Sequence, residues 1–284
     1  MRISWRIRIG LTLLHHLFLT GNTATNIKLF AKLFNMFRPL RGAGLVKRGT
    51  ILSYLSVFLS RSLSTRQKLE ISTHHYAFLQ AVFSAEQLSA LFNEGIEFYA
   101  EQNSSDPLNI LLVHSPAYIY EGPCALTFNV NGTEYARISF MTAPGYLFGL
   151  DDLSVFYISC MQKKHSEEGT SKITHVNSIH PVTTLLKVLK AFGSAHGIDK
   201  CIAVAAENQL SYIPGREDYD YFFSLYDDFW LSKGGSVLGT DYLLPFPLVQ
   251  KPILDIKQTH RNRIRKKRTK LQQIHNAVYN RFKH

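Results

Sequence analysis

The sequence predicts an α/β fold: a mixed sheet flanked by helices, with a basic helical N-terminal region and a basic C-terminal helix. Apolar residues recur at helical intervals near both ends of the chain, whereas short apolar runs of strand length fill its middle. The middle reads as a helix, three or four strands, and then helix, strand, helix and strand. This order is that of an α/β layer with a mixed sheet.

Charge divides the chain into three segments. The net charge of +11 over 284 residues is uneven: residues 1–70 hold 12 basic and one acidic residue, and residues 251–284 hold 11 and one. Residues 71–250 hold 9 basic and 19 acidic residues. We therefore expect a basic helical N-terminal region (1–70), an α/β core domain (71–250) and a basic C-terminal helix (251–284). An anionic partner would be met by the ends, not by the acidic core.

The N-terminal region combines basic and apolar residues. Its first 21 residues imitate a signal peptide, but His15 and His16 interrupt the apolar run, which is too short to span a bilayer. An uncleaved amphipathic helix is the favoured interpretation, and a cleaved signal is the alternative. Two further helices are predicted over 26–37 and 51–59, with a break at Pro39. They either pack on a neighbouring domain or lie at a membrane surface.

The first half of the core predicts one helix and then strands. Ser84 and Gln87 have capping-box spacing and begin a helix that extends to about Gln102. Strands follow at 109–115, 124–140 and 154–162. Within the second of these, Asn131-Gly132 favours a tight hairpin turn.

The second half of the core alternates helices and strands. Pro181 is a favoured first helical residue, and Gly197 ends that helix. A short apolar strand at 201–206 and an aromatic helix at 221–235 follow. The stretch 241–249 predicts an edge strand, because its two prolines cannot serve a central ladder.

Metal and disulfide chemistry are not indicated. The three cysteines, Cys124, Cys160 and Cys201, have neither metal-ligand nor redox spacing, and are expected as buried apolar residues in strands of a reduced, cytosolic protein. His175 and His180 are five residues apart with no acid or cysteine spaced to complete a metal site.

Four residues are candidates for acid–base catalysis, each with a structural alternative. Glu121 stands before a strand and could be a turn carboxylate. His180 precedes a helix and could contact an anion or cap the helix. Glu207 follows an apolar strand, at the end where α/β proteins bind ligands. Asp227 and Asp228 diverge by about 100° on a helix, so at most one of them faces a given pocket.

The order of elements after residue 154 carries a first resemblance. A strand, a loop, the helix PVTTLLKVLKAFGSAHGI, the strand CIAVAA and a helix with Tyr226 are similar to the second half of an N-acetyltransferase-like (GNAT) fold. In that family the loop before the long helix binds the pyrophosphate of acyl-CoA through backbone N–H groups. The resemblance implies Asn177 and Ser178 as cofactor-binding residues. This loop lacks glycine, so side chains would crowd acyl-CoA, and acyl carrier protein is the alternative donor.

A second resemblance covers residues 68–279. HHYAFL (74–79), Glu121-Gly122, FYISCMQ (156–162), THVNSIHP (174–181) and YDDFWLSKGG (226–235), followed by the basic run, resemble the VirK/YbjX family in this order. The resemblance implies a bacterial, Gram-negative envelope protein associated with virulence, surface-protein placement and tolerance of cationic antimicrobial peptides. It implies no settled reaction.

The C-terminal segment predicts an amphipathic helix. Ile264, Leu271, Ile274, Val278 and Phe282 fall within about 80° of one another on a helical wheel, and cations occupy the remaining arc. Such a helix packs as a strap on the core, contacts lipid headgroups or binds nucleic acid. The candidate membrane or anion contacts are Arg261, Arg263, Arg265, Lys266, Lys267, Arg268 and Lys270.

These observations favour a protein that supports envelope integrity from the cytoplasmic side, peripheral at the inner membrane. Its expected partners are an anionic membrane surface and an envelope or surface protein. The first alternative is an acyltransferase that acts on an amine or hydroxyl of a lipid or protein. The second is a nucleic-acid-binding protein, against which stand the acidic core and the lack of a nucleic-acid module.

Overall fold

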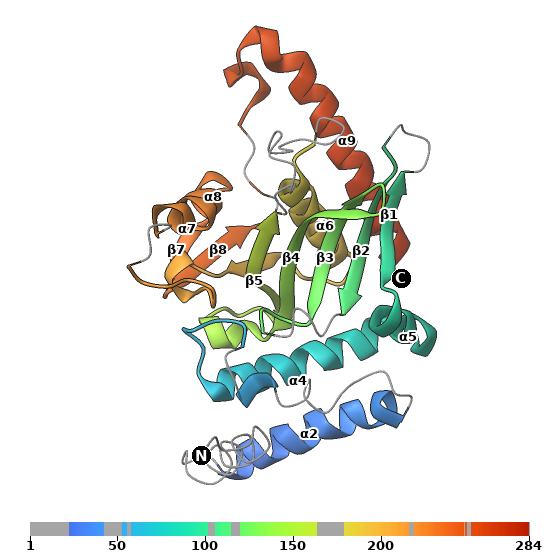
Figure 1. Ribbon diagram of the computed structural model, residues 1–284, viewed down its shortest axis with the longest axis vertical. Coiled ribbons are helices and arrows are strands. Elements are labelled where there is room, and N and C mark those ends of the chain that lie inside the picture. The colour runs from blue at the N-terminus through green and yellow to red at the C-terminus, as the bar shows by residue number, and fades with distance from the viewer. Residues whose placement is uncertain are drawn as a thin grey trace.

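A computed structural model describes residues 23–42, 53–55, 58–101, 106–114, 120–163, 179–215, 219–246, 248 and 251–283. Within these ranges the strands form one sheet of order β1-β2-β3-β4-β5-β6-β8-β7, in which only β5 and β6 pair in parallel (Figure 1). The mixed α/β fold is therefore confirmed. The strands are β1 (Ile96–Glu101), β2 (Leu108–His114), β3 (Cys124–Val130), β4 (Thr133–Ala143), β5 (Val155–Lys163), β6 (Lys200–Ala203), β7 (Ser236–Leu238) and β8 (Asp241–Pro245).

Helices cover one face and one end of this sheet. The α-helices are α2 (Thr23–Gly42), α4 (Thr65–Val82), α5 (Ala85–Asn93), α6 (Pro181–Ala195), α7 (Tyr219–Leu225), α8 (Asp227–Ser232) and α9 (Gln258–Phe282). Short 3-10 helices are η1 (Ser53–Leu55), η3 (Gly145–Phe148), η4 (Ala206–Asn208) and η5 (Ile253–Asp255). In Figure 1, α6 and α9 lie behind the sheet, α4 runs along its lower end, and α2 lies outside α4.

Aromatic packing joins α6 and α9 to the sheet. The Phe192 ring of α6 lies 6.5 Å from Phe156 of β5, 5.1 Å from Phe98 of β1 and 5.2 Å from Phe282 of α9, measured between ring centroids. These rings are buried, and burial of apolar surface is the main stabilising contribution to such a core. The α6 helix therefore connects the edge strand β1 and the interior strand β5 to the C-terminal helix.

Several local predictions are confirmed. The capping box at Ser84 forms, with hydrogen bonds in both directions between Ser84 and Gln87. Asn131 and Gly132 both have positive φ, 49° and 74°, as a type I′ hairpin turn requires. Pro181 is the first residue of α6. All three cysteines are buried and free, one each in β3, β5 and β6.

The helix predicted from Ser84 to Gln102 is wrong in its second half. The α5 helix ends at Asn93, and residues 96–101 form β1. Gly95 adopts φ +90°, where a Cβ would lie 2.9 Å from Cγ1 of Val113, so this glycine permits the turn into the strand. Ile96 and Phe98 then face the core two residues apart, which is strand spacing.

Two further predictions in the second half of the core are corrected. The aromatic helix 221–235 is two short helices, α7 and α8, which are separated at Tyr226. The edge strand predicted at 241–249 is internal: β8 lies between β6 and β7, and β7 is the edge. Pro245 is tolerated because it is the last residue of β8, where its missing N–H interrupts no continuing ladder.

The N-terminal predictions are met in part. The α2 helix continues past Pro39 to Gly42, because a proline one turn from a helix end removes few hydrogen bonds. In the predicted helix 51–59 the structure describes only η1 and irregular residues. The α4 helix was missed, although Ser64 and Gln67 form the same capping box as in α5. The first 22 residues lie outside the described ranges.

Part of α2 packs on the core and part remains exposed. Phe37 is buried, with its ring centroid 4.2 Å from that of Tyr76 on α4. Ile27 and Phe34 are each 40% exposed on the outer side. Among the described residues, no helix combines the length and the apolar character needed to cross a bilayer.

Candidate functional site

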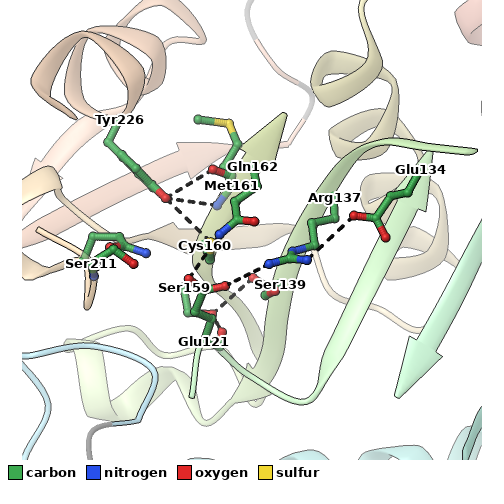
Figure 2. A network of polar contacts seen from close by, with 11 residues as sticks. Glu121, Glu134, Arg137, Ser139, Ser159, Cys160, Met161, Gln162, Ser211 and Tyr226 are labelled. Carbon is green, nitrogen blue, oxygen red and sulfur yellow. Dashed lines mark hydrogen bonds and ion pairs between the residues drawn. The ribbon is translucent and has the colours of Figure 1, made fainter. Parts of the chain in front are cut away.

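The parallel strands β5 and β6 diverge at their C-terminal ends, and a tyrosine lies between them. Strand pairing stops at Ile158 and Ala203, after which the Val204 N–H still donates to the Ile158 carbonyl at 2.9 Å. Further along β5, the Tyr226 hydroxyl accepts from the Met161 N–H and donates to the Met161 carbonyl, both at 3.2 Å. Figure 2 shows this side chain pointing at the edge of β5. Tyr226 thus takes the hydrogen-bonding place of a neighbouring strand.

The residues after Tyr226 bond to the segment that follows β6. The Asp227 carboxylate accepts from the Ala206 N–H at 3.0 Å, and the Trp230 indole donates to the Val204 carbonyl at 2.9 Å. The side chains of Tyr226, Asp227 and Trp230 are all buried. We call Tyr226, Asp227 and Trp230 the clasp, because together they hold the diverging ends of β5 and β6. The YDDFW motif is thereby explained as a source of backbone hydrogen-bond partners.

Asp227 and Asp228 face in different directions, as their helical spacing predicts. Asp227 is buried and Asp228 is exposed. Burial raises the pKa of the Asp227 carboxyl, and the negative charge of Glu207 raises it further. Tyr242 of β8 contributes an opposing hydrogen bond to this carboxylate. The structure therefore brings Asp227 and Glu207, two of the four catalytic candidates, close together at the end of β6.

Asp241, at the start of β8, is a site residue that the sequence reasoning missed. One of its carboxylate oxygens accepts from the Ala205 N–H and the Asn208 side-chain amide, both at 3.0 Å. The other accepts from the Tyr157 hydroxyl at 3.1 Å and the Ser62 hydroxyl at 3.3 Å. Its only local signal is an acid at the head of an otherwise apolar strand. Four donors fully satisfy this buried carboxylate, which is the requirement for burying a charge.

Glu121 belongs to a polar network with residues of β4 and β5, and Cys160 of β5 connects this network to the Tyr226 hydroxyl (Figure 2). Its carboxylate lies 3.5 Å from the Arg137 guanidinium and accepts from the Gln162 amide at 3.3 Å. Arg137 also lies 3.7 Å from Glu134. The Ser159 hydroxyl donates to the Glu121 carbonyl. These contacts hold the turn before β3, so the structure shows Glu121 as a structural anchor of that turn.

The remaining candidate residues of the core lie in the segments next to α6 and β6. His180 is the N-cap of α6, where its Nδ1 accepts from the Thr183 N–H at 3.4 Å. Capping, one of the two roles considered for His180, is therefore present. Glu207 lies in η4 and is exposed. Asn177 and Ser178 lie outside the described residues, so their proposed contact with an acyl donor stays a prediction.

The seven cations of α9 have different surroundings. Arg261 donates to the Ile256 carbonyl at 2.9 Å and the Leu254 carbonyl at 2.8 Å, so it holds the turn that precedes the helix. Lys270 forms an ion pair with Glu101 of β1. Lys267 and Arg268 are half-buried beside α6. The exposed cations among the seven are Arg263, Arg265 and Lys266.

The apolar residues of α9 account for its position. Leu271, Ile274, Val278 and Phe282 are buried in the core, so the second half of the helix is a strap on α6 and β1. Ile264, in the first half, is only half-buried. Within the described ranges, no group of three His, Cys, Asp or Glu side chains is placed to hold a metal ion.

The fold and these contacts define an α/β protein with a mixed sheet, a side-chain clasp at the parallel pair β5–β6, and a basic C-terminal strap. A family model described as "Protein of unknown function (DUF535)" matches residues 22–280. The chain belongs to this family, and the match spans the whole predicted core (71–250) and most of the two basic segments. No curated protein and no solved structure matches the chain.

Proposed function

We propose that the protein binds peripherally to an anionic membrane surface through the first half of α9. One observation carries this proposal: Arg263, Arg265 and Lys266 are exposed on a stretch of helix that extends beyond the sheet, whereas the second half of the same helix is anchored in the core (Figure 1). The buried seam makes the helix rigid, so its cations are presented without the entropy cost of ordering a free tail.

The expected strength follows from the number of exposed cations. A basic residue near an anionic leaflet contributes about 1 kcal/mol. Three residues therefore contribute about 3 kcal/mol, or roughly a hundredfold in partition coefficient. The acidic core, residues 71–250, is repelled by the same surface, which favours contact through the α9 end.

The proposed membrane contact does not include α2, a described helix of the basic N-terminal region. Figure 1 places α2 at the opposite end of the long axis from the first half of α9. A flat bilayer that meets the tip of α9 is therefore out of reach of α2, so the contact we propose uses the C-terminal helix.

The cellular role we propose is support of the Gram-negative envelope from the cytoplasmic side. Its support is membership of DUF535, which is the VirK/YbjX family named by the resemblance. Surface-protein placement and tolerance of cationic peptides are the processes in which we expect a loss of the protein to be visible.

An acyltransferase is the second candidate, favoured by Asp227 and Glu207 at the C-terminal end of the parallel pair. The position of Tyr226 weighs against it, because an extended acyl donor between diverging strands would need the backbone groups of Met161 that the tyrosine occupies. We therefore rank membrane binding first. A thermal-shift screen with dodecanoyl-CoA and acyl carrier protein tests the enzyme hypothesis, and stabilisation by either that is lost in E207Q would favour it.

Flotation with vesicles tests membrane binding. The full chain should float with vesicles of phosphatidylglycerol and phosphatidylcholine at low salt, and remain behind with vesicles of phosphatidylcholine alone. The triple variant R263Q/R265Q/K266Q should lose roughly a hundredfold in partition coefficient. A wild-type chain that does not float with anionic vesicles would refute the proposal.

A matched variant separates site from net charge. K28Q/K32Q/R281Q also removes three positive charges, but from exposed positions on α2 and at the far end of α9. It should float like the wild type. If both triple variants lose the same affinity, binding depends only on overall charge, and the assignment to the first half of α9 is wrong.

A further inference from the structure

A groove with an apolar floor and a basic rim lies between α6, the end of α8 and α9. It has a volume of about 270 Å³. Its floor comes from aliphatic side chains on three segments, namely Leu186, Leu248, Ile256, Ile264 and Leu271. Its rim carries six cations, namely Lys187, Lys190, Lys233, Lys251, Lys267 and Arg268. None of the described residues that line it is acidic.

The rim cations converge from separate elements of the chain. Burial lowers the pKa of Lys233 at the end of α8, and the charge of Lys267 on α9 lowers it further. Burial likewise lowers the pKa of Lys190 on α6, followed by the charge of Lys187. Among the described residues, no carboxylate forms an ion pair with any of the six. Five of the six are half-buried and Lys251 is exposed. Cations that lie close together and repel one another gain free energy when an anion binds between them.

Two of these cations are already oriented by contacts within the protein. Arg268 donates to the Lys251 carbonyl, which fixes its guanidinium against the segment between β8 and α9. The Lys233 ammonium lies 4.8 Å from the ring centroid of Phe229 on α8. This cation–π contact restricts where the ammonium can lie. The rim is thus partly preorganised, which lowers the entropy cost of binding.

We propose that this groove binds a single-chain amphiphile with a phosphate headgroup. The rim would hold the phosphate by charge-assisted hydrogen bonds, and the aliphatic floor would cover the first part of the hydrocarbon chain. The volume lies just below the range of about 300 to 1,000 Å³ that is typical of small-molecule pockets. It therefore suits one chain and not a two-chain lipid or a folded partner.

The ligand class follows from the combination of floor and rim. A bare phosphate would leave the aliphatic floor exposed to water, and a neutral chain would leave the cations unneutralised. This site is distinct from the proposed membrane contact, because Arg263, Arg265 and Lys266 are exposed and do not line the groove. A phosphate monoester of a lipid and an acyl-CoA share the required chemistry, so the experiment has an arm for each.

Isothermal titration calorimetry on the full chain tests the proposal. Decyl phosphate below its micellar concentration should bind, and inorganic phosphate and decyl glucoside at equal concentration should each bind at least tenfold more weakly, because each makes only half of the contacts. The absence of binding of decyl phosphate, or equal binding of inorganic phosphate, would overturn the proposal.

Two double variants locate the site. K233Q/K267Q should weaken decyl phosphate binding by roughly tenfold or more, since it removes two of the converging charges. It relieves like-charge repulsion, so it should melt no lower than the wild type. R265Q/K266Q removes equal charge from the exposed side of α9 and should change the affinity less than about twofold. Equal losses in the two variants would place the ligand elsewhere and refute the groove.

A last experiment distinguishes the two sources of the phosphate, an acyl-CoA and a lipid phosphate monoester. Dodecanoyl-CoA that binds more tightly than dodecyl phosphate, with the same loss in K233Q/K267Q, supports the groove and assigns it to an acyl donor. Equal or weaker binding supports the groove with a lipid phosphate as its source. Loss of vesicle flotation in R263Q/R265Q/K266Q with unchanged decyl phosphate affinity would show that the two sites act separately.

Discussion

Replacing Tyr226 by phenylalanine removes one hydroxyl from the clasp and leaves the ring in place. The ring packs with its centroid 6.1 Å from that of Phe222 and 6.4 Å from that of Trp230, so phenylalanine should occupy the same space without a cavity. What is lost is the partner of the Met161 N–H and carbonyl, each 3.2 Å from the hydroxyl. Tyr226 is only 2% exposed, so water cannot replace the hydroxyl without a rearrangement.

The expected loss can be worked from these contacts. A buried backbone donor or acceptor without a partner costs about 1–3 kcal/mol. Two such groups are left on Met161, and partial relaxation of β5 recovers some of the cost. We therefore expect Y226F to lower the free energy of unfolding by about 2–4 kcal/mol, a large share of the 5–15 kcal/mol that is typical of a folded protein.

Urea denaturation followed by circular dichroism and tryptophan fluorescence measures this loss. The midpoint should fall at an unchanged m-value, because the surface exposed on unfolding stays the same. Y146F is the control: its hydroxyl donates to Glu70 at 2.5 Å, but the side chain is 66% exposed, so water can take over the hydrogen bond. This control should stay within about 0.5 kcal/mol of the wild type.

A Y226F variant as stable as Y146F would refute this reasoning. It would mean that the backbone groups of Met161 have another partner when the hydroxyl is absent, and hence that the space between β5 and β6 admits water or a ligand. The edge of β5 would then be accessible to an acyl donor, which is the main requirement of the acyltransferase hypothesis.

Three further predictions concern stability. Burial lowers the pKa of His114 from 6.5 to about 3. Its contribution to stability is therefore full above about pH 6.5 and is lost as the pH falls towards 3. In thermal melts over this range, the melting temperature of H114Q should depend less on pH than that of the wild type. Gly122 has φ +110° and a Cβ there would lie 3.2 Å from Oγ of Ser159, so G122A should cost about 1–3 kcal/mol in urea, more than G132A at an open turn. I274A should cost about 2–5 kcal/mol and Q273A under about 0.5 kcal/mol in the same assay, because only Ile274 is buried.

Local signals predicted most elements correctly where they were self-contained. The capping box at Ser84, the Asn131-Gly132 turn and the seam of α9 each act within a few residues, so a sequence window contains the whole cause. The same rule would have located α4 through Ser64 and Gln67. The misplaced end of α5 and the break at Tyr226 arise from contacts with distant strands, which no window contains.

The sequence by itself determined the class of fold, the acidic core between basic ends and the amphipathic nature of the C-terminal helix, because period and charge follow directly from residue order. Only the tertiary structure decided what the polar residues do. Asp227 and Asp241 proved to hold the backbone after β6, Glu121 to pair with Arg137, and β8 to lie inside the sheet. Each of these depends on residues that are far apart in the chain and meet only when the strands pair. The same is true of the basic groove, whose cations come from separate elements and gather only when α9 packs on α6.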